Sequence, residues 1–204
     1  MDTKNETQDS FDDGLPLALR EQLVQRDRKA LAVFFDAYFD RIYGYVRRLV
    51  NHEHQAEDLT QEIFLQLQKG FDKYDPTRAL RPWVFTIATN KMRDHWRSRG
   101  HRDALATSSL EQEDYTFDVP TLEAGSEEQL TNEELADHLR RAIDELPEGM
   151  RVAVQLRVFE ELSFESIGEI LGRNAVAVRK RYSRALEQLR EVMGPAWQLH
   201  RETN

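Results

Sequence analysis

Residues 28–50 repeat apolar side chains at three- and four-residue steps, which is the spacing of an amphipathic α-helix. The repeating positions are Leu31, Phe34, Phe35, Tyr38, Ile42, Tyr45, Val46 and Leu49. Nowhere does the sequence show the strict alternation of apolar and polar residues that is typical of a half-buried β-strand. The chain is therefore predicted to be all-α, and each helix must bury its apolar stripe against a neighbour.

Two more helices are predicted in the first half of the chain. One runs from about residue 53 to residue 69 and ends at Gly70, and its buried residues are Leu59, Ile63 and Leu67. The next begins at Pro82, because proline suits the first helical position, and continues to about Arg99, just before Gly100. The residues between the two helices, FDKYDPTRALR, predict a loop.

Charge is distributed unevenly along the chain. The net charge is −9, which by itself argues against a general nucleic-acid binder. However, residues 77–102 contain seven basic side chains and one acid, and residues 171–190 contain six basic side chains and one acid. Between these blocks, residues 104–134 carry nine acids and no lysine or arginine. Two basic segments are thus separated by an acidic one.

The acidic segment has the composition of a linker. It shows little periodicity and contains Ser108, Ser109, Pro120, Gly125 and Ser126. It therefore divides the chain into two domains. Two roles remain open for it: a solvated tether, or a segment that competes with nucleic acid by lying against the basic faces of Arg93, Arg97 or Arg179.

The second domain has the pattern of a helix-turn-helix. A helix is predicted after Ser163, a tight break at Gly172 and a long helix capped by Asn174. The residues expected to pack between the two helices are Ile167, Ile170, Leu171, Val178, Tyr182, Ala185 and Leu186. The cations of the second helix stay outside, where they can neutralise phosphates while its early residues enter the major groove.

The helix predicted from Pro82 carries a second candidate nucleic-acid surface. Its stripe consists of Trp83, Thr86, Asn90, Arg93 and Arg97. Aromatic rings stack on unpaired bases while guanidinium groups follow phosphates, so this stripe suits single-stranded or melted DNA. The competing interpretation is that Trp83 or Trp96 simply belongs to the core.

Four stretches resemble one family. They are AEDLTQEIF, DPTRALRPWVFTIATNKMRDHWR, ELPEGMRVAVQLRVFEELSFESIGEILG and RKRYSRALEQLR. In this order and spacing they are similar to the sigma-70 family of RNA polymerase sigma factors, specifically the extracytoplasmic-function (ECF) group. The resemblance implies two small all-α domains joined by a flexible acidic linker, the second domain containing the helix-turn-helix.

The same resemblance implies a division of the chain into five parts. Residues 1–27 form an N-terminal extension and residues 28–102 the region 2 domain, which binds core polymerase and the minus-ten element. Residues 103–131 are the linker. Residues 132–193 form the region 4 domain, which binds the minus-thirty-five element, and residues 194–204 are a C-terminal tail.

Roles for individual residues also follow from the resemblance. Polymerase binding, to the clamp helices of the largest subunit, falls to Glu57, Asp58, Gln61 and Glu62. Minus-ten binding falls to Arg78, Leu80, Arg81, Trp83, Thr86, Asn90, Arg93 and Arg97. Minus-thirty-five binding falls to Asn174, Ala175, Ala177, Val178, Arg179, Arg181, Tyr182 and Arg184. Leu80, Val176 and Ala177 depart from the residues found in many members.

The function expected on these grounds is recruitment of core polymerase to a promoter and promoter opening, without an enzymatic reaction or a cofactor. The polymerase flap and promoter DNA are further expected partners, and the resemblance allows for an anti-sigma factor. The alternative is a helix-turn-helix regulator that does not dock on polymerase. A nucleic-acid enzyme lacks an evident acid-base cluster, and a metal site at His54 and Asp58 lacks further ligands.

The expected location is the cytoplasm. The N-terminal residues are polar and acidic, unlike a signal peptide, and no apolar run is long enough to span a bilayer. The chain contains no cysteine, which suits a reducing compartment and excludes thiolate zinc sites and cysteine nucleophiles.

Overall fold

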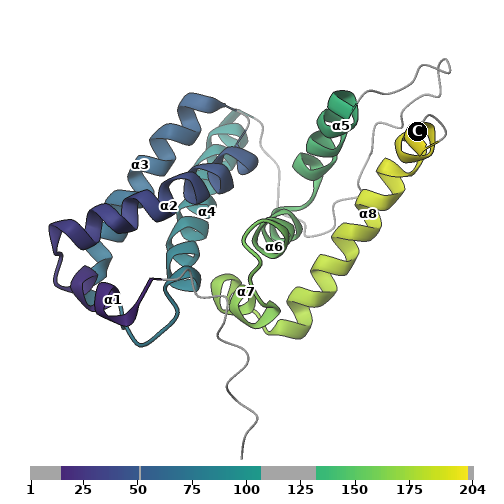
Figure 1. Cartoon of the computed structure of the whole chain (residues 1–204). Coiled ribbons are helices and arrows are strands. Elements are labelled where there is room, and N and C mark those ends of the chain that lie inside the picture. The colour runs from purple at the N-terminus through teal and green to yellow at the C-terminus, as the bar shows by residue number, and fades with distance from the viewer. Residues whose placement is uncertain (1–14, 51, 107–131, 202–204) are drawn as a thin grey trace, which may run out of the picture.

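The computed structural model of the protein describes residues 15–50, 52–106 and 132–201. All regular elements in these ranges are helices (Figure 1), which confirms the all-α prediction. The first domain contains α1 (Leu17–Val24), α2 (Arg28–Leu49), α3 (Glu53–Gly70), the 3₁₀ helix η1 (Phe71–Lys73) and α4 (Leu80–Ala106). The second contains α5 (Asn132–Glu145), α6 (Glu148–Val158), α7 (Phe164–Leu171) and α8 (Ala175–Arg201). None of the helices in the described ranges is long and apolar enough to cross a membrane.

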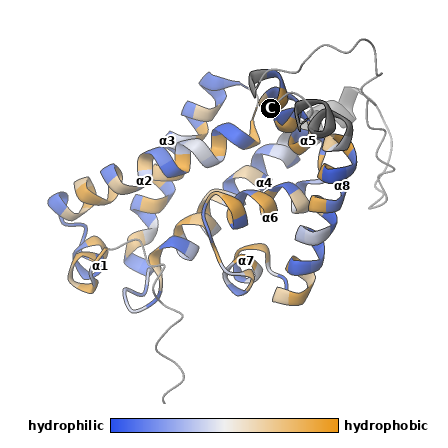
Figure 2. Ribbon diagram, turned by 45° about the vertical axis from the view of Figure 1, so that its right-hand side comes forward, coloured by the Kyte–Doolittle hydropathy of each residue, from blue (hydrophilic) through white to orange (hydrophobic). Residues whose placement is uncertain are grey.

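Helix α2 lies at the centre of the first domain. Its start is fixed by Asp27, whose carboxylate accepts hydrogen bonds from the backbone N–H groups of Lys29 and Ala30 at 2.9 and 3.0 Å. Of the predicted apolar stripe, Phe35 is exposed, whereas the residues from Phe34 and Tyr38 to Leu49 are buried. The hydroxyl groups of Tyr45 and of Thr89 in α4 share a buried hydrogen bond of 2.9 Å. Figure 2 shows hydrophobic and hydrophilic residues mixed along each helix, as amphipathic packing requires.

Helix α4 is longer than the sequence predicted at both ends. It starts at Leu80, two residues before Pro82, and passes Gly100 to end at Ala106. A proline is tolerated there because the first N–H groups of a helix have no acceptor within it. A glycine inside a helix costs only about 1 kcal/mol relative to alanine, which the flanking turns of a long helix can offset. Of the predicted linker, residues 107–131 lie outside the described ranges.

The predicted N-terminal extension contains a helix that belongs to the first domain. Helix α1 packs on α2 and η1, and Leu23 is fully buried. The Arg20 guanidinium donates a hydrogen bond of 2.9 Å to the backbone oxygen of Arg78, in the loop before α4. The extension therefore supports the loop that was assigned to minus-ten recognition.

Trp83 has a structural environment inside the first domain. Its ring lies 5.2 Å from that of Phe71 and 4.9 Å from that of Tyr74, measured between centroids. A Cβ atom at Gly70 would lie 3.3 Å from the same ring, so the indole fills the space that this glycine leaves. The contacts with Phe71, Tyr74 and Gly70 therefore favour the interpretation that Trp83 belongs to the core.

The helix-turn-helix is built as the sequence predicted. The Ser163 hydroxyl accepts a hydrogen bond of 3.0 Å from the N–H of Ser166, and the Asn174 side chain accepts one of 2.8 Å from the N–H of Ala177. Gly172 between them has φ 64°, the left-handed conformation that ends many helices. The two caps and the turn between α7 and α8 therefore lie where the sequence predicted them.

The predicted packing between these helices is only partly correct. Val178 is buried, but Leu186 is exposed, and Ala185 joins a separate apolar cluster with α5 and α6. Because α8 continues to Arg201, it includes part of the predicted C-terminal tail. The later turns of α8 therefore pack against α5 and α6 instead of α7.

The two domains pack against each other. Helix α7 lies against α4, and α6 contacts α2 (Figure 1). One cluster of buried apolar side chains runs through both, including Tyr45 and Met92 of the first domain and Leu156 and Ile170 of the second. The contact brings the helix-turn-helix to the helix that carries the predicted single-strand surface.

The turn glycine gives a first prediction. Gly172→Ala should destabilise the protein by about 1–2 kcal/mol, because a Cβ atom is strained in the left-handed conformation. Gly194→Ala is the matched control, since Gly194 lies in α8 with no neighbour near its missing Cβ, and should be neutral or slightly stabilising. Urea unfolding of both variants measures the difference, and equal midpoints would contradict the strain argument.

A second prediction concerns Trp83. Trp83→Ala should lower the free energy of unfolding by about 2–3 kcal/mol, because it removes the ring packed on Phe71 and Tyr74. Trp83→Phe retains an aromatic contact and should cost less than half of that. If Trp83→Ala unfolds at the wild-type urea concentration, the ring serves nucleic acid alone and not the core.

Candidate functional site

The four predicted polymerase-binding residues form one exposed face of α3. Glu57, Asp58, Gln61 and Glu62 occupy adjacent turns, while Leu59 and Ile63 point into the core. The Glu57 carboxylate lies 3.5 Å from Nδ1 of His54, and the Glu62 carboxylate pairs with the Lys91 ammonium of α4. The face is acidic, and the ion pair with α4 fixes one of its carboxylates.

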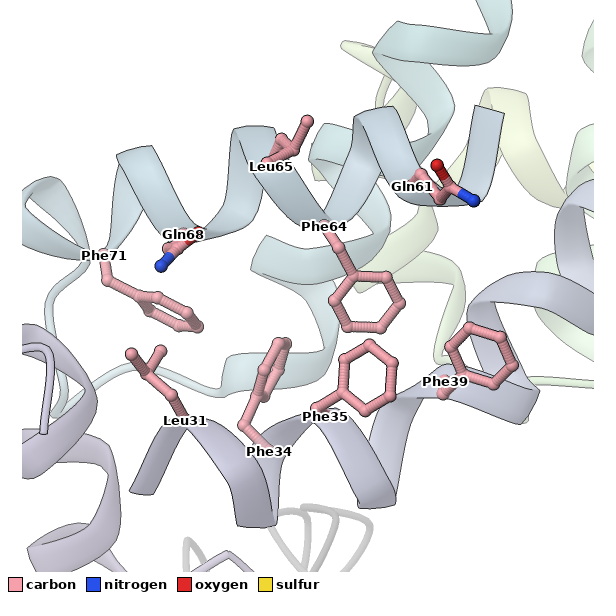
Figure 3. Close-up of a pocket in the computed structure, with 9 residues that line it drawn as sticks. All are labelled: Leu31, Phe34, Phe35, Phe39, Gln61, Phe64, Leu65, Gln68 and Phe71. Carbon is pink, nitrogen blue, oxygen red and sulfur yellow. The ribbon is translucent and has the colours of Figure 1, made fainter. Parts of the chain in front are cut away.

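An apolar groove adjoins this face (Figure 3). It lies between α2 and α3, has a volume of about 540 Å³ and shares Gln61 with the acidic face. Phe35, Phe39 and Leu65 line it and are 45%, 37% and 55% exposed. The Phe64 ring joins the two helices, with centroids 4.9 Å from Phe35 and 6.0 Å from Phe39.

This groove is not predicted from the sequence, in which Phe35 is one more residue of the apolar repeat in α2. The signal was a second aromatic stripe at four-residue steps, Phe35, Phe39 and Tyr43, rotated away from the buried stripe of Phe34 and Tyr38. A groove with aromatic walls and an acidic border suits an amphipathic helix that carries cations beside its apolar face.

The predicted minus-ten residues differ in how exposed their side chains are. Arg78, Asn90 and Arg97 have exposed side chains, and Arg93 is half-buried. Leu80 is fully buried in the core and Arg81 is nearly so, and thus neither offers its side chain to DNA in this structure. Thr86 is half-buried, and its hydroxyl donates to the backbone oxygen of Pro82 at 2.7 Å.

The loop before α4 is organised by Asp75. Its carboxylate accepts hydrogen bonds from the Thr77 hydroxyl at 2.7 Å and from the Thr77 backbone N–H at 2.9 Å. These bonds hold the pKa of Asp75 below its usual value. The Tyr74 hydroxyl donates to the backbone oxygen of Arg78, so the loop that presents Arg78 is fixed at both ends.

On the arginine side of α4, two contacts come from the second domain. The Arg93 guanidinium lies 3.5 Å from the backbone oxygen of Leu171 and 3.7 Å from the Glu148 carboxylate. It also lies 3.4 Å from the side-chain oxygen of Asn90, its neighbour on the stripe. Arg97 pairs with Asp94 within α4 at 3.3 Å.

The predicted minus-thirty-five residues also differ in exposure. Arg179 and Arg184 are exposed on α8, whereas Val178 is fully buried and Tyr182 packs its ring against Phe164 at 5.6 Å. Asn174 caps the helix, and the half-buried residues of this set are Ala175, Ala177, Arg181 and Tyr182. Val178 and Tyr182 thus support the helix from behind, and the arginines form its exposed part.

Val176 is an exposed residue that the list of DNA contacts omitted. It lies in the first turn of α8 and is 71% exposed, between the half-buried Ala175 and Ala177. An exposed methyl group at the start of a recognition helix suits the methyl group of thymine in the major groove. The sequence signal was a β-branched apolar residue two positions after the cap Asn174, outside the buried stripe.

Comparison with known proteins identifies the family. The sequence profile of Sigma-70 region 2 matches residues 34–102, and that of Sigma-70, region 4 matches residues 128–189. The "ECF RNA polymerase sigma factor SigW" of Bacillus subtilis (strain 168) is 31% identical over 175 residues, which cover 85% of this chain and 94% of that protein. The "RNA polymerase sigma factor CarQ" of Myxococcus xanthus is 34% identical over 160 residues, which cover 78% and 87% of the two chains.

A solved structure has the same fold. It is the sigma factor RpoE in complex with the anti-sigma factor NepR from Bartonella quintana, with a TM-score of 0.63 and 22% identity. The match covers 81% of this chain and 98% of that chain. Both sigma-70 regions are present in order, and identity to SigW exceeds 30% over most of both chains. The protein therefore belongs to the sigma-70 family of RNA polymerase sigma factors, in the extracytoplasmic-function group.

Proposed function

We propose that the protein binds core RNA polymerase, directs it to a promoter and helps to hold the opened strand. The observation that carries the proposal is the combination of an acidic α3 face beside an apolar groove with arginine surfaces on α4 and α8. A helix-turn-helix regulator without polymerase docking uses only the surface on α8. The family membership and the α3 face therefore favour the sigma-factor function over that alternative.

Docking on polymerase is assigned to the acidic face and the groove together. The proposed occupant is the clamp-helix pair of the largest polymerase subunit. Carboxylates give charge-assisted hydrogen bonds to basic side chains on such a helix and steer the encounter. The groove adds apolar area next to them, so Phe35, Phe39 and Leu65 join the proposed docking residues.

The two arginine surfaces are assigned to different parts of the promoter DNA. Arg179, Arg184 and Val176 are assigned to the duplex at the minus-thirty-five element, where cations bind phosphates and apolar groups contact base edges. Arg78, Asn90, Arg93 and Arg97 are assigned to the melted minus-ten strand. Trp83 has a structural role, and its part in strand binding is to hold α4 against η1.

The remaining assignments concern partners and chemistry. The second domain is assigned to the polymerase flap, and an anti-sigma factor is a further proposed partner because the similar RpoE structure contains one. Sigma factors are transcription initiation factors, and we assign this protein no covalent step of its own. It acts in the cytoplasm, where polymerase meets the chromosome.

Transcription in vitro tests the proposal as a whole. Core polymerase is supplied with fragmented genomic DNA of the source organism, with and without the protein. Transcripts that start at defined sites only in its presence are the expected result. If core polymerase gives the same transcripts without the protein, the proposal is wrong.

The docking assignment gives a third prediction. Asp58→Arg with Glu62→Arg should reduce binding to core polymerase at least roughly a hundredfold, because both carboxylates are replaced by charges that a basic partner repels. Pull-down measures binding, and circular dichroism checks that the helical content is retained. Glu21→Arg with Glu191→Arg makes the same change in net charge on exposed positions of α1 and α8, and should bind normally. Equal binding by the two double variants would contradict the assignment.

A fourth prediction concerns the α8 surface. Arg184→Ala should weaken binding of the holoenzyme to promoter duplex and lower the slope of log affinity against log salt by about 1, as expected for one lost phosphate contact. Arg190→Ala is the matched control, since Arg190 is exposed more than one turn further along α8. A salt series of fluorescence anisotropy compares them, and identical slopes for both variants and the wild type would remove Arg184 from the DNA surface.

A further inference from the structure

The aromatic ring of Phe164 lies beside the DNA-binding surface assigned to α8. Phe164 is the first residue of α7, directly after the cap residue Ser163, and its side chain is half-buried against the core. The Tyr182 ring of α8 meets it edge to face, with centroids 5.6 Å apart and an interplanar angle of 60°. A cap on the backbone side and an aromatic contact from α8 therefore fix where this ring lies.

Two guanidinium groups lie over the Phe164 ring. The central carbon of the Arg179 guanidinium is 5.1 Å from the ring centroid, and that of Arg157 is 4.9 Å from it. Both distances fall within the reach of a cation–π interaction, which extends to about 6 Å. Arg157 of α6 is also fixed elsewhere, because its guanidinium donates a hydrogen bond of 2.9 Å to the backbone oxygen of Leu162.

Arg179 is the member of this pair that can reach DNA. Its side chain is 58% exposed, and it lies in the second turn of α8, near the end of a recognition helix that meets base edges. A second contact joins one of its terminal nitrogens to the exposed Glu165 carboxylate at 4.0 Å. An exposed ion pair of that length contributes little and weakens with salt. The aromatic ring is therefore the contact that best defines the position of the Arg179 guanidinium.

The two contacts of Arg179 differ in what they leave free for DNA. A carboxylate uses the N–H groups of a guanidinium and repels phosphate, so the pair with Glu165 competes with DNA. The Phe164 ring is uncharged and attracts the cation through its face, so the five N–H groups of Arg179 stay available. Guanine and phosphate both accept two N–H groups from one arginine. The ring thus restricts the side chain before binding without using the atoms that contact the duplex, which lowers the entropy lost on binding.

We propose that Phe164 is a positioning residue for promoter recognition: its ring holds the Arg179 guanidinium in place for contact with the minus-thirty-five duplex. Arg157 and Tyr182 keep the ring in position from α6 and α8. The inference rests on the proposed function, which assigns Arg179 to that duplex. It extends the DNA-reading unit from α8 to the first residue of α7.

A double-mutant cycle tests whether Phe164 acts through Arg179. Binding of the holoenzyme, which is core polymerase with the full-length protein, is measured by fluorescence anisotropy on a labelled promoter duplex from the transcription experiment. Phe164→Leu keeps an apolar side chain but removes the ring, and should weaken binding roughly fourfold, as expected for one exposed cation–π contact. In the Arg179→Ala background the same change should cause no further loss, because the guanidinium that the ring positions is absent.

Three matched variants separate positioning from packing. In the Arg184→Ala background Phe164→Leu should keep its effect, since Arg184 lies five residues further along α8, which is about 7.5 Å along the helix axis. Phe164→Tyr retains the ring and should bind as the wild type does. Phe159→Leu removes a ring outside α7 and α8 that has its own guanidinium, from Arg48 at 4.1 Å, and should leave DNA binding unchanged.

Circular dichroism and urea unfolding show whether each variant is folded, and Phe164→Met is a second variant without a ring that carries the test if Phe164→Leu unfolds. A loss that disappears in the Arg179→Ala background and persists in the Arg184→Ala background supports the proposal. If Phe164→Leu binds like the wild type, or weakens binding equally in all backgrounds, Phe164 does not act through Arg179 and the proposal is wrong. If Arg179→Ala alone leaves binding unchanged, the proposal is wrong and so is the assignment of Arg179 in the proposed function.

Discussion

The helices in the described parts of the chain bury apolar side chains, and a short helix is not stable in water until its apolar face is buried. This constraint explains why the buried cluster passes through both domains instead of stopping at their boundary. Helix α7 is only 8 residues long, and it buries Ile167 and Ile170 between α8 and α4. The burial of α7 thus depends on the first domain as well as on α8.

The ion pairs between the two domains have a different effect from the apolar packing. Apolar packing tolerates small shifts in register, whereas the Glu160 carboxylate satisfies Arg41 and Arg48 only in one relative position. Burial raises the pKa of Glu160, and the attraction of the arginines opposes that rise. The ion pairs therefore contribute more to the specific orientation of the two domains than to net stability.

The sequence was sufficient wherever the determining interaction is local. Ser163, Gly172 and Asn174 were placed correctly because a cap or a left-handed turn depends on its immediate neighbours. The ends of α4 were wrong because packing over a long helix outweighs a proline in the first turn and a glycine near its end. Periodicity identified the buried stripes of α2 and α3 for the same local reason.

Tertiary contacts explain what the sequence could not reveal. Phe35 and Phe34 are adjacent aromatic residues, and only the position of α3 makes one a groove wall and the other a core residue. Leu80 and Val178 lie in segments assigned to DNA, yet their side chains support the helices from within. Glu160 resembles any acid at the end of a helix until three arginines from more than 70 positions earlier surround it.

Charge is distributed unevenly over the folded protein. A net charge of −9 opposes approach to DNA, and the basic surfaces of α4 and α8 must overcome it locally. Arg78 and Arg93 are also paired with acids of the second domain, which lowers the local positive potential where strand binding is proposed. The acidic face of α3 takes no part in these two pairs. In the proposed function, the free protein is therefore better suited electrostatically to a basic partner of α3 than to DNA.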